Sequence, residues 1–204
     1  MAKNMQPIVK RCRALDISPA VMGYTKKSKT GSTKRNPGGQ RRHKKSEYAN
    51  QLNEKQKVKF VYGILEKQFR MYYEKAAKTR GITGEILLTT IERRLDNVIF
   101  RLGLARTRRE ARQLVTHGFF SVNGKAVNIP SYLVSAGNVI AVREKYRSND
   151  ALKVILSETS GRLLPQWLTF DAEALEGKVT CLPKREDIDF PVQEHLIVEL
   201  YSKE

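Results

Sequence analysis

The chain has few of the residues that metal sites, disulfide frameworks and membrane spans require. Its 204 residues include two cysteines, Cys12 and Cys181, far apart and with no histidine or second cysteine at ligand spacing. We therefore expect two reduced thiols, no metal and no cofactor, with Cys12 a spacer in a basic segment and Cys181 a small buried hydrophobe. No apolar run reaches the length of a membrane span, and we find no signal-peptide or lipidation pattern. We expect a soluble, intracellular protein.

Acidic residues are scarce at one end of the chain and outnumber basic ones at the other. Residues 1–45 hold 13 Lys and Arg against one acid, residues 46–150 hold 19 against 10, and residues 151–204 hold 6 against 10. The formal net charge of the whole chain is +17. Such an excess favours a polyanionic partner, with nucleic acid as the leading candidate and a membrane surface as the rival.

The first 45 residues also lack apolar side chains over most of their length, from Tyr24 to Lys45 especially. This composition predicts an arm that is disordered alone and becomes ordered when phosphates neutralise it. A solubilising tail is the alternative, which the one-sided charge disfavours. The side chains of the arm that we assign to RNA are Lys10, Arg11, Arg13, Lys26, Lys27, Arg35, Arg41, Arg42, Lys44 and Lys45.

Helical periodicity begins at Ser46, which is placed as an N-cap, and ends near Glu92. Lys55 and Lys57 fall largely off the apolar side, and we assign both to RNA. A solvated face is the alternative, and helical charge alone does not decide between the two. The apolar side is predicted to be one continuous helical stripe of Val58, Val61, Tyr62, Leu65, Phe69 and Tyr72. A second helical face, closed by Gly103, contains Leu95, Val98, Ile99 and Leu102.

Residues 107–124, TRREARQLVTHGFFSVNG, predict a helix followed by a hairpin. Thr107 and Glu110 fit a capping box, and Gly118 occupies the position just after the helix. The dipeptide Asn123-Gly124 favours a type I′ turn. We expect strands at residues 120–122, 125–129, 132–134 and 139–142.

A group of arginines surrounds the start of this helix, where unpaired amides and the helix dipole attract anions. Guanidinium groups fork onto phosphate oxygens, so we predict a phosphate clamp that Lys125 approaches from the turn. A solvated face is the alternative, disfavoured because only Glu110 offsets the charge. The clamp consists of Arg106, Arg108, Arg109 and Arg112. We also assign to RNA Arg93, Arg94, Thr107, His117 and Asn123.

His117 has no Cys, Asp or Ser at workable spacing within the helix and hairpin, so an RNA contact is favoured over catalysis or metal binding. The last third of the chain is harder to interpret. Residues 154–156 and 167–170 suggest short strands or helix ends, with a turn at Gly177-Lys178. The final segment, PVQEHLIVELYSKE, predicts a helix with Pro191 in its first position.

The run RRLDNVIFRLGLARTRREARQLVTHGFFSVNGKAVNIPSYLVSAGNVIAVRE resembles the small RNA-binding module named after small-subunit ribosomal protein S-four. The flanking runs SEYANQLNEKQKVKFVYGILEKQFRMYYEKAAK, TGEILLTTIERRLDNV and EHLIVELYSK are similar to the bacterial form of that ribosomal protein family. Some members bind zinc through a cysteine cluster, which is not carried over because Cys12 stands alone. The segment Asn36–Gln40 resembles the family's Pro-Gly-Gln-rich loop, which places Arg41, Arg42, Lys44 and Lys45 near the opening where the messenger enters.

The resemblance implies an α+β fold of three parts. Residues 1–45 form a basic arm extended on RNA, residues 46–92 form a helical domain completed by a C-terminal helix at 189–204, and residues 93–188 form the S-four-type module with its β extension. The implied function is that of a cytoplasmic ribosomal protein. It binds small-subunit ribosomal RNA, nucleates ribosome assembly, contacts neighbouring small-subunit proteins, influences the accuracy of translation and, in some members, represses its own messenger. No membrane or small-molecule substrate is implied.

Two other functions use the same module. Pseudouridine synthases carry it, and Arg94-Leu95-Asp96 copies their Arg-Leu-Asp motif. Here the motif lies on the module's first helix and no segment is long enough for a catalytic sheet, so we expect no enzyme and place Asp96 on a helix surface, paired with an arginine such as Arg93. A free-standing RNA chaperone would not need the helical flank or the C-terminal segment.

Overall fold

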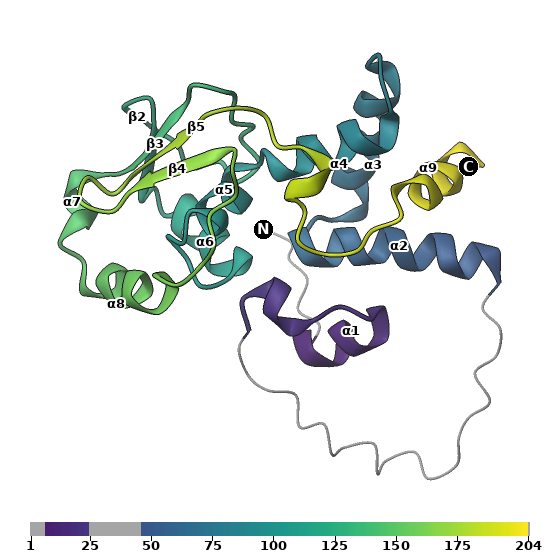
Figure 1. Ribbon diagram of the computed structural model, residues 1–204, viewed down its shortest axis with the longest axis horizontal. Coiled ribbons are helices and arrows are strands. Elements are labelled where there is room, and N and C mark those ends of the chain that lie inside the picture. Colours follow the sequence, from purple (N-terminus) through teal and green to yellow (C-terminus); the bar gives the residue numbers. More distant parts are fainter. Residues whose placement is uncertain (1–6, 25–45, 204) are drawn as a thin grey trace, which may run out of the picture.

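The computed structural model describes residues 7–24 and 46–203, in which helices and one antiparallel sheet pack together (Figure 1). This arrangement confirms the α+β fold. The buried apolar side chains form two clusters, one among the helices and the C-terminal segment and one around the sheet. Most of the predicted arm lies outside the described residues, including Lys26, Lys27, Arg35, Arg41, Arg42, Lys44, Lys45 and the Asn36–Gln40 loop.

The first cluster is built by α2 (Glu47–Tyr62), α3 (Glu66–Lys78), α4 (Thr83–Glu92) and α9 (Glu194–Ser202). Ser46 caps α2 as predicted, because its hydroxyl accepts a hydrogen bond of 3.2 Å from the amide of Ala49. The C-terminal helix α9 packs against α2 and α4 (Figure 1), and its Ile197, Leu200 and Tyr201 are buried. It begins at Glu194, so the prediction of Pro191 as its first residue is wrong.

The prediction of one continuous helical stripe from Val58 to Tyr72 is wrong, because α2 ends at Tyr62 and a separate helix, α3, begins at Glu66. Gly63 follows α2 with a φ of 64°, a left-handed conformation that glycine adopts without a steric penalty. The break turns Leu65 outward, where it is 40% exposed, and buries Ile64 in its place. Apolar spacing alone did not reveal the break, although Gly63 marks it.

The N-terminal segment differs from the extended arm that its charge predicts. Residues Ile8–Leu15 form α1 and Pro19–Met22 form a short 3-10 helix, η1 (Figure 1). Cys12 and Leu15 are buried in the helical cluster, so Cys12 is a core residue and not a spacer. Burial also raises the pKa of the Cys12 thiol. The positive charges of α1 therefore lie on a packed helix with an apolar side.

The second cluster lies between a pair of helices and a five-stranded antiparallel sheet of order β2-β1-β3-β5-β4. Along β1 and β3, Phe120, Val122, Ile140 and Val142 turn inward while the residues between them are partly exposed. The elements are α5 (Leu95–Arg101), α6 (Arg108–Thr116), β1 (Phe120–Val122), β2 (Lys125–Ala126), β3 (Val139–Val142), α7 (Glu144–Arg147), α8 (Asp150–Thr159), β4 (Leu168–Asp171), β5 (Glu176–Val179) and a 3-10 helix η3 (Arg185–Asp187).

Several predictions for this region are corrected. Residues 132–134 form a single bridge, from Leu133 to Arg94, and no strand, while residues 154–156 lie within α8. The pair Gly177-Lys178 lies in β5 and not in a turn. A Cβ at Gly177 would lie 2.5 Å from the Leu102 side chain, so the absence of a side chain at this position allows Leu102 to pack against the strand. Cys181 is exposed, not buried.

Candidate RNA-binding surface

The start of α6 is held by the Thr107 cap that the sequence predicts, but the Glu110 carboxylate bonds the Arg106 amide and not the Thr107 amide that a capping box requires. The Thr107 hydroxyl accepts a hydrogen bond of 3.1 Å from the Glu110 amide, and the Glu110 carboxylate accepts one of 2.6 Å from the Arg106 amide. At the other end, Gly118 has a φ of 70° and directs the chain into β1. Both ends of α6 are therefore held in place. The burial of each side chain shows which face of the helix packs inward and which is exposed.

Arg108 points inward, so its predicted place in a phosphate clamp is wrong. Its Nε donates to the Asn97 Oδ1 at 2.8 Å and its Nη1 to the Val21 carbonyl at 2.6 Å. The guanidinium carbon lies 4.2 Å from the centre of the Phe100 ring. Burial lowers the pKa of Arg108, and the nearby Arg101 lowers it further. Arg108 shares the inward face of α6 with Ala111 and Val115, at the spacing i, i+3, i+7.

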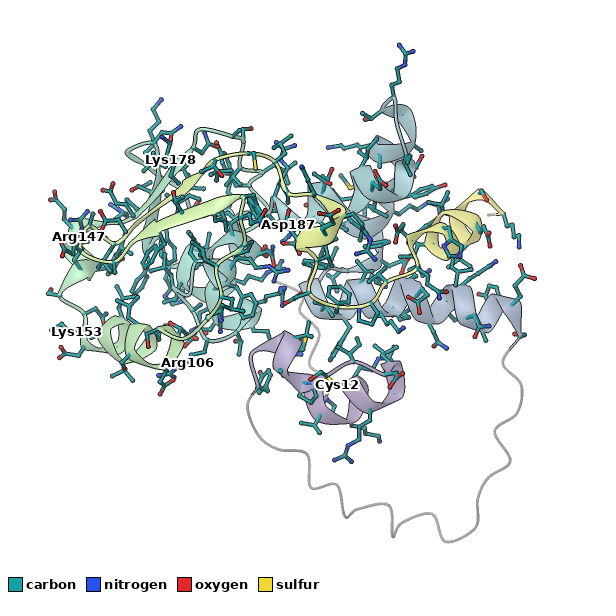
Figure 2. The ribbon with its side chains drawn as sticks, in the orientation of Figure 1. Cys12, Arg106, Arg147, Lys153, Lys178 and Asp187 are labelled. Carbon is teal, nitrogen blue, oxygen red and sulfur yellow. The ribbon has the colours of Figure 1, made fainter. Side chains whose placement is uncertain are left out.

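The other clamp arginines are not gathered at one point. Arg106 lies 2.6 Å from the Glu158 carboxylate of α8, and Figure 2 shows it beside that helix. Arg112 is partly buried, and its Nη1 donates to the Gly63 carbonyl at 3.4 Å and lies 3.8 Å from the Asp96 carboxylate. Arg109 is exposed and makes no ion pair with any residue in the described part of the chain. The clamp of four is therefore reduced to one open arginine.

Arg109 belongs to an exposed polar face of α6. Gln113 and His117 follow it at i+4 and i+8, and both are exposed. We call Arg109, Gln113 and His117 the outer α6 face. Lys125 is exposed in β2, just beyond the Asn123-Gly124 turn, whose φ values of 48° and 77° fit the predicted type I′ geometry. Asn123 also has a structural part, because its side-chain oxygen accepts from the Val139 amide at 2.8 Å.

Arg94 is completely buried, which contradicts its assignment to RNA. Its Nε and Nη2 donate to both oxygens of Asp96 at 3.0 and 2.6 Å, and its Nη1 donates to the Tyr72 hydroxyl at 2.9 Å. Asp96 is therefore a buried partner of Arg94, not a surface partner of Arg93. Arg93 instead bonds the Val134 carbonyl at 2.7 Å. Held in this fork, Asp96 is closed to solvent and to a uridine substrate.

A buried polar network joins the two clusters behind the outer α6 face. Glu92, at the end of α4, accepts hydrogen bonds from Tyr62, from Arg101 at 2.7 Å and from the Asn97 side chain, which also accepts from Arg108. Arg101 further pairs with Asp189 at 2.8 Å. Burial lowers the pKa of Arg101, but Glu92 outweighs it and the net direction is upward. We call Arg94, Arg101, Arg108 and the groups they bond the junction network.

The lysines assigned to α2 are engaged within the protein. Lys55 is buried, donates to Glu66 at 3.1 Å and lies 5.1 Å from the centre of the Tyr201 ring, so its RNA assignment is contradicted. Lys57 pairs with Glu54 at 2.6 Å. Burial raises the pKa of Glu66, but hydrogen bonds from Lys59, Tyr201 and Lys55 outweigh it and lower that pKa to about 2.

Exposed cations that we did not predict lie at two other places. Lys145 and Arg147 follow β3 on α7, and Lys75, Lys78 and Arg80 lie at the tip of α3. Helical charge patterning contained a signal for the α3 tip, where three basic residues stand within six positions. On α1, Lys10 and Arg13 are exposed and Arg11 is partly buried, so these assignments stay predictions.

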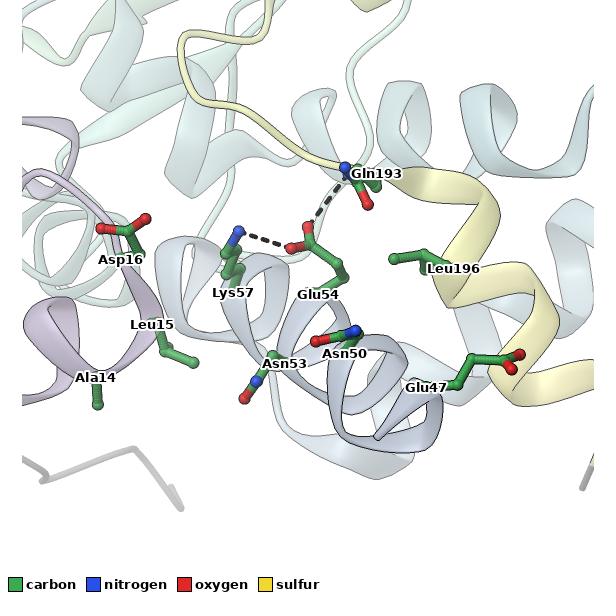
Figure 3. Close-up of a pocket in the computed structure, with 10 residues that line it drawn as sticks. All are labelled: Ala14, Leu15, Asp16, Glu47, Asn50, Asn53, Glu54, Lys57, Gln193 and Leu196. Atoms are coloured by element: carbon green, nitrogen blue, oxygen red, sulfur yellow. Dashed lines mark hydrogen bonds and ion pairs between the residues drawn. The ribbon is translucent and has the colours of Figure 1, made fainter. Parts of the chain in front are cut away.

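A pocket of about 370 Å³ lies between α1, α2 and the start of α9 (Figure 3). Its charged lining residues are Asp16, Glu47, Glu54 and Lys57, and Glu54 is held by Lys57 and by the Gln193 amide at 3.2 Å. Excess negative charge opposes a phosphate ligand. Among residues 7–24 and 46–203, no cluster of histidine, cysteine or acidic side chains is arranged to hold a metal, and no helix is long and apolar enough to cross a membrane.

Two family models match adjacent parts of the sequence, and the boundary between them lies between α4 and α5. Residues 93–140 match the S4 domain family, and residues 3–92 match the family described as ribosomal protein S4/S9 N-terminal domain. The first match covers α5, α6 and the hairpin, which carry the outer α6 face and Lys125. Fold and surface thus define an S4-domain protein.

Full-length relatives narrow this class. The chain is 56% identical over 203 residues to small ribosomal subunit protein uS4 of Agathobacter rectalis and 57% identical over 203 residues to that of Lachnospira eligens. It is 53% identical over 208 residues to the protein of the same name from Caldicellulosiruptor saccharolyticus. Each comparison covers 100% of both chains. The chain belongs to the uS4 family of small ribosomal subunit proteins.

Proposed function

We propose that the chain is a structural constituent of the small ribosomal subunit, a ribonucleoprotein, in which it binds ribosomal RNA directly and nucleates assembly. The observation that carries this proposal is the identity of 56% over the whole length of a protein named small ribosomal subunit protein uS4. The charge of +17 supports a polyanionic partner. The position of the outer α6 face within the S4 domain supports RNA contact there.

The outer α6 face acts by docking on phosphates of a folded RNA. Arg109, His117 and Lys125 meet the backbone, while the capped ends of α6 and the junction network keep the helix in place. Contacts of this kind position a protein on RNA and read its shape more than its sequence. No step requires a metal, a cofactor or a bond to be broken.

The finer parts of the function extend from the family to this chain. The protein contacts neighbouring small-subunit proteins, lies near the opening where the messenger enters and contributes to the accuracy of translation in the cytoplasm. Repression of its own messenger, which some members of the family carry out, is a further function open to it. The domain limits at 46–92 with 189–204, and at 93–188, belong to the same proposal. The two buried clusters support this division in outline, but the helical cluster also includes Cys12, Leu15, Ile17, Met22 and Ile188.

Enzymatic pseudouridine synthesis is the alternative that the chemistry disfavours. Its nucleophile would be Asp96, which the Arg94 fork and burial withhold from RNA. Tritium release from uridine-labelled RNA, if it depended on Asp96, would overturn this assignment. A free-standing chaperone is disfavoured by relatives that match the chain over its full length, helical part included.

The proposal is tested by washing isolated small ribosomal subunits with salt. A structural constituent has many phosphate contacts and packs into the assembled RNA, so it stays with the subunit through a high-salt wash and sedimentation. A loosely bound chaperone is stripped, because its phosphate contacts weaken steeply with salt. The matched variant replaces Arg41, Arg42, Lys44 and Lys45 by alanine and keeps residues 7–24, whose Cys12, Leu15 and Met22 belong to the helical core. Its partial loss in the wash would measure the contribution of the arm's charge.

A further inference from the structure

A stacked pair of aromatic rings lies at the end of the outer α6 face, on residues that the proposed contacts do not use. Phe119 precedes β1 and Tyr146 lies on α7, and their ring centres are 3.9 Å apart with an angle of 8° between the planes. Both rings are partly buried and pack against the sheet cluster. Two segments separated by 27 positions therefore build one flat apolar surface beside His117.

The Tyr146 ring is fixed in place by its neighbours. Its hydroxyl donates to the His117 carbonyl at 3.2 Å, and its amide donates to the Arg143 carbonyl at 2.9 Å. Arg143 in turn bonds both sides of the same corner, through its side chain to the Gly118 carbonyl at 3.0 Å and through its amide to the Phe119 carbonyl at 3.0 Å. A ring held in this way loses little conformational entropy when a ligand stacks on it.

A cation completes the surface. The Lys145 ammonium lies 4.7 Å from the centre of the Tyr146 ring. Because Phe119 fills one face of that ring at stacking distance, the ammonium of the exposed Lys145 lies over the other face. Lys145 is exposed and bonds to no acid in the described part of the chain, whereas Arg147, labelled in Figure 2, pairs with Glu176 at 3.5 Å. Glu144 is the single acid within α7 itself.

We propose that Tyr146, backed by Phe119, is a stacking platform for one unpaired RNA base, and that Lys145 moves from the ring to the phosphate beside that base. A flat aromatic face next to a mobile cation is the arrangement by which proteins hold single-stranded nucleotides without reading their sequence. The platform continues the outer α6 face past His117 onto α7. It rests on the proposed RNA binding and adds to it a contact that depends on stacking.

Three variants test the platform in binding to transcribed small-subunit ribosomal RNA at several salt concentrations. Tyr146→Leu keeps apolar bulk but removes the aromatic face, and it weakens affinity by about 5- to 150-fold with the salt slope unchanged. Tyr146→Phe keeps the ring and stays within about threefold of the parent. Lys145→Ala makes the slope of log binding constant against log salt concentration shallower by about one, which corresponds to the loss of one phosphate contact. The matched control is Tyr132→Leu, which removes an exposed tyrosine elsewhere on the module and leaves affinity unchanged.

A measurement on the unaltered protein covers the case in which Tyr146→Leu fails to fold. Short-wavelength ultraviolet light is applied to the complex, and the RNA-linked peptides are identified by mass spectrometry. A nucleotide attached to Tyr146 or Phe119 supports the platform. Links at other peptides but none here, or equal affinity of folded Tyr146→Leu and the parent, overturn the platform and leave RNA binding intact. Failure of the parent protein to bind the RNA overturns the proposed function itself.

Discussion

The junction network and the outer α6 face use the same kinds of side chain for opposite purposes. Arg94, Arg101 and Arg108 are buried and bond carboxylates, an amide and a carbonyl, while Arg109 next in sequence to Arg108 is open to solvent. One step along α6 rotates a residue by about 100°, which is enough to move an arginine from the packed side of the helix to its exposed side. In a strongly basic protein, therefore, positive charge in the sequence does not by itself mark the surface that meets RNA.

The largest effect in this comparison is expected from Arg94→Ala. The change leaves the buried Asp96 carboxylate without its two-pronged partner, and Arg112 remains 3.8 Å from it. Loss of one member of a buried ion pair costs about 3–5 kcal/mol of the free energy of unfolding. Urea denaturation followed by circular dichroism measures it. Arg93→Ala, at a partly exposed neighbour, is the control, and a similar loss in both variants would contradict the distinction between buried and exposed arginines.

A smaller effect separates the adjacent pair Arg108 and Arg109. Arg108→Ala leaves the Asn97 oxygen and the Val21 carbonyl without a donor, which costs about 1–3 kcal/mol of stability. It leaves the salt slope of RNA binding as it was. Arg109→Ala does the reverse: stability changes by less than about 0.5 kcal/mol, and the slope falls by about one count. Paired melting and salt-titration experiments check both, and a flattened slope in Arg108→Ala would move that arginine to the surface.

The smallest effect concerns the half-exposed ion pairs around Glu66. The pKa of Glu66 is lowered from 4.5 to about 2 in the folded protein, so its stabilising effect is fully present above pH 4.5 and is lost as the pH falls toward 2. Its side chain is 47% exposed, and solvent screening limits the contribution at neutral pH to less than about 1 kcal/mol. Denaturation of Glu66→Gln and the parent across this pH range should show a difference that shrinks on acidification. A difference that grows would contradict the assignment.

Local rules predicted those parts of the molecule in which one short segment decides the outcome. The Ser46 cap, the Thr107 cap and the turn at Asn123-Gly124 depend on residues within four positions of one another, and all three are confirmed. The resemblance of the sequence to the S-four family supplied the fold class, which the sheet and helices also confirm.

Parts that depend on distant packing were not predicted. Arg108 is drawn inward by the Val21 carbonyl and the Asn97 side chain, neither of which lies near it in sequence. From sequence alone Gly177 suggests a turn, whereas in the structure it lies in β5, where Leu102 leaves no room for a Cβ. The Phe119 and Tyr146 rings meet only after β1 and β3 have paired. Periodicity identifies the apolar side of a helix, but it cannot show which charged residue forms a buried hydrogen bond with a distant segment.

The hydrogen bond from Arg108 to the Val21 carbonyl also constrains the order in which the chain matures. The two residues are 87 positions apart, so the N-terminal segment emerges during synthesis long before α6 exists to receive it. At about 5–20 residues per second, the interval is roughly 4 to 17 seconds. During that time Cys12 and Leu15 can pack on the first helices, but the carbonyl of Val21 has only water as a partner. The beginning of the protein is thus among the last parts to be finished.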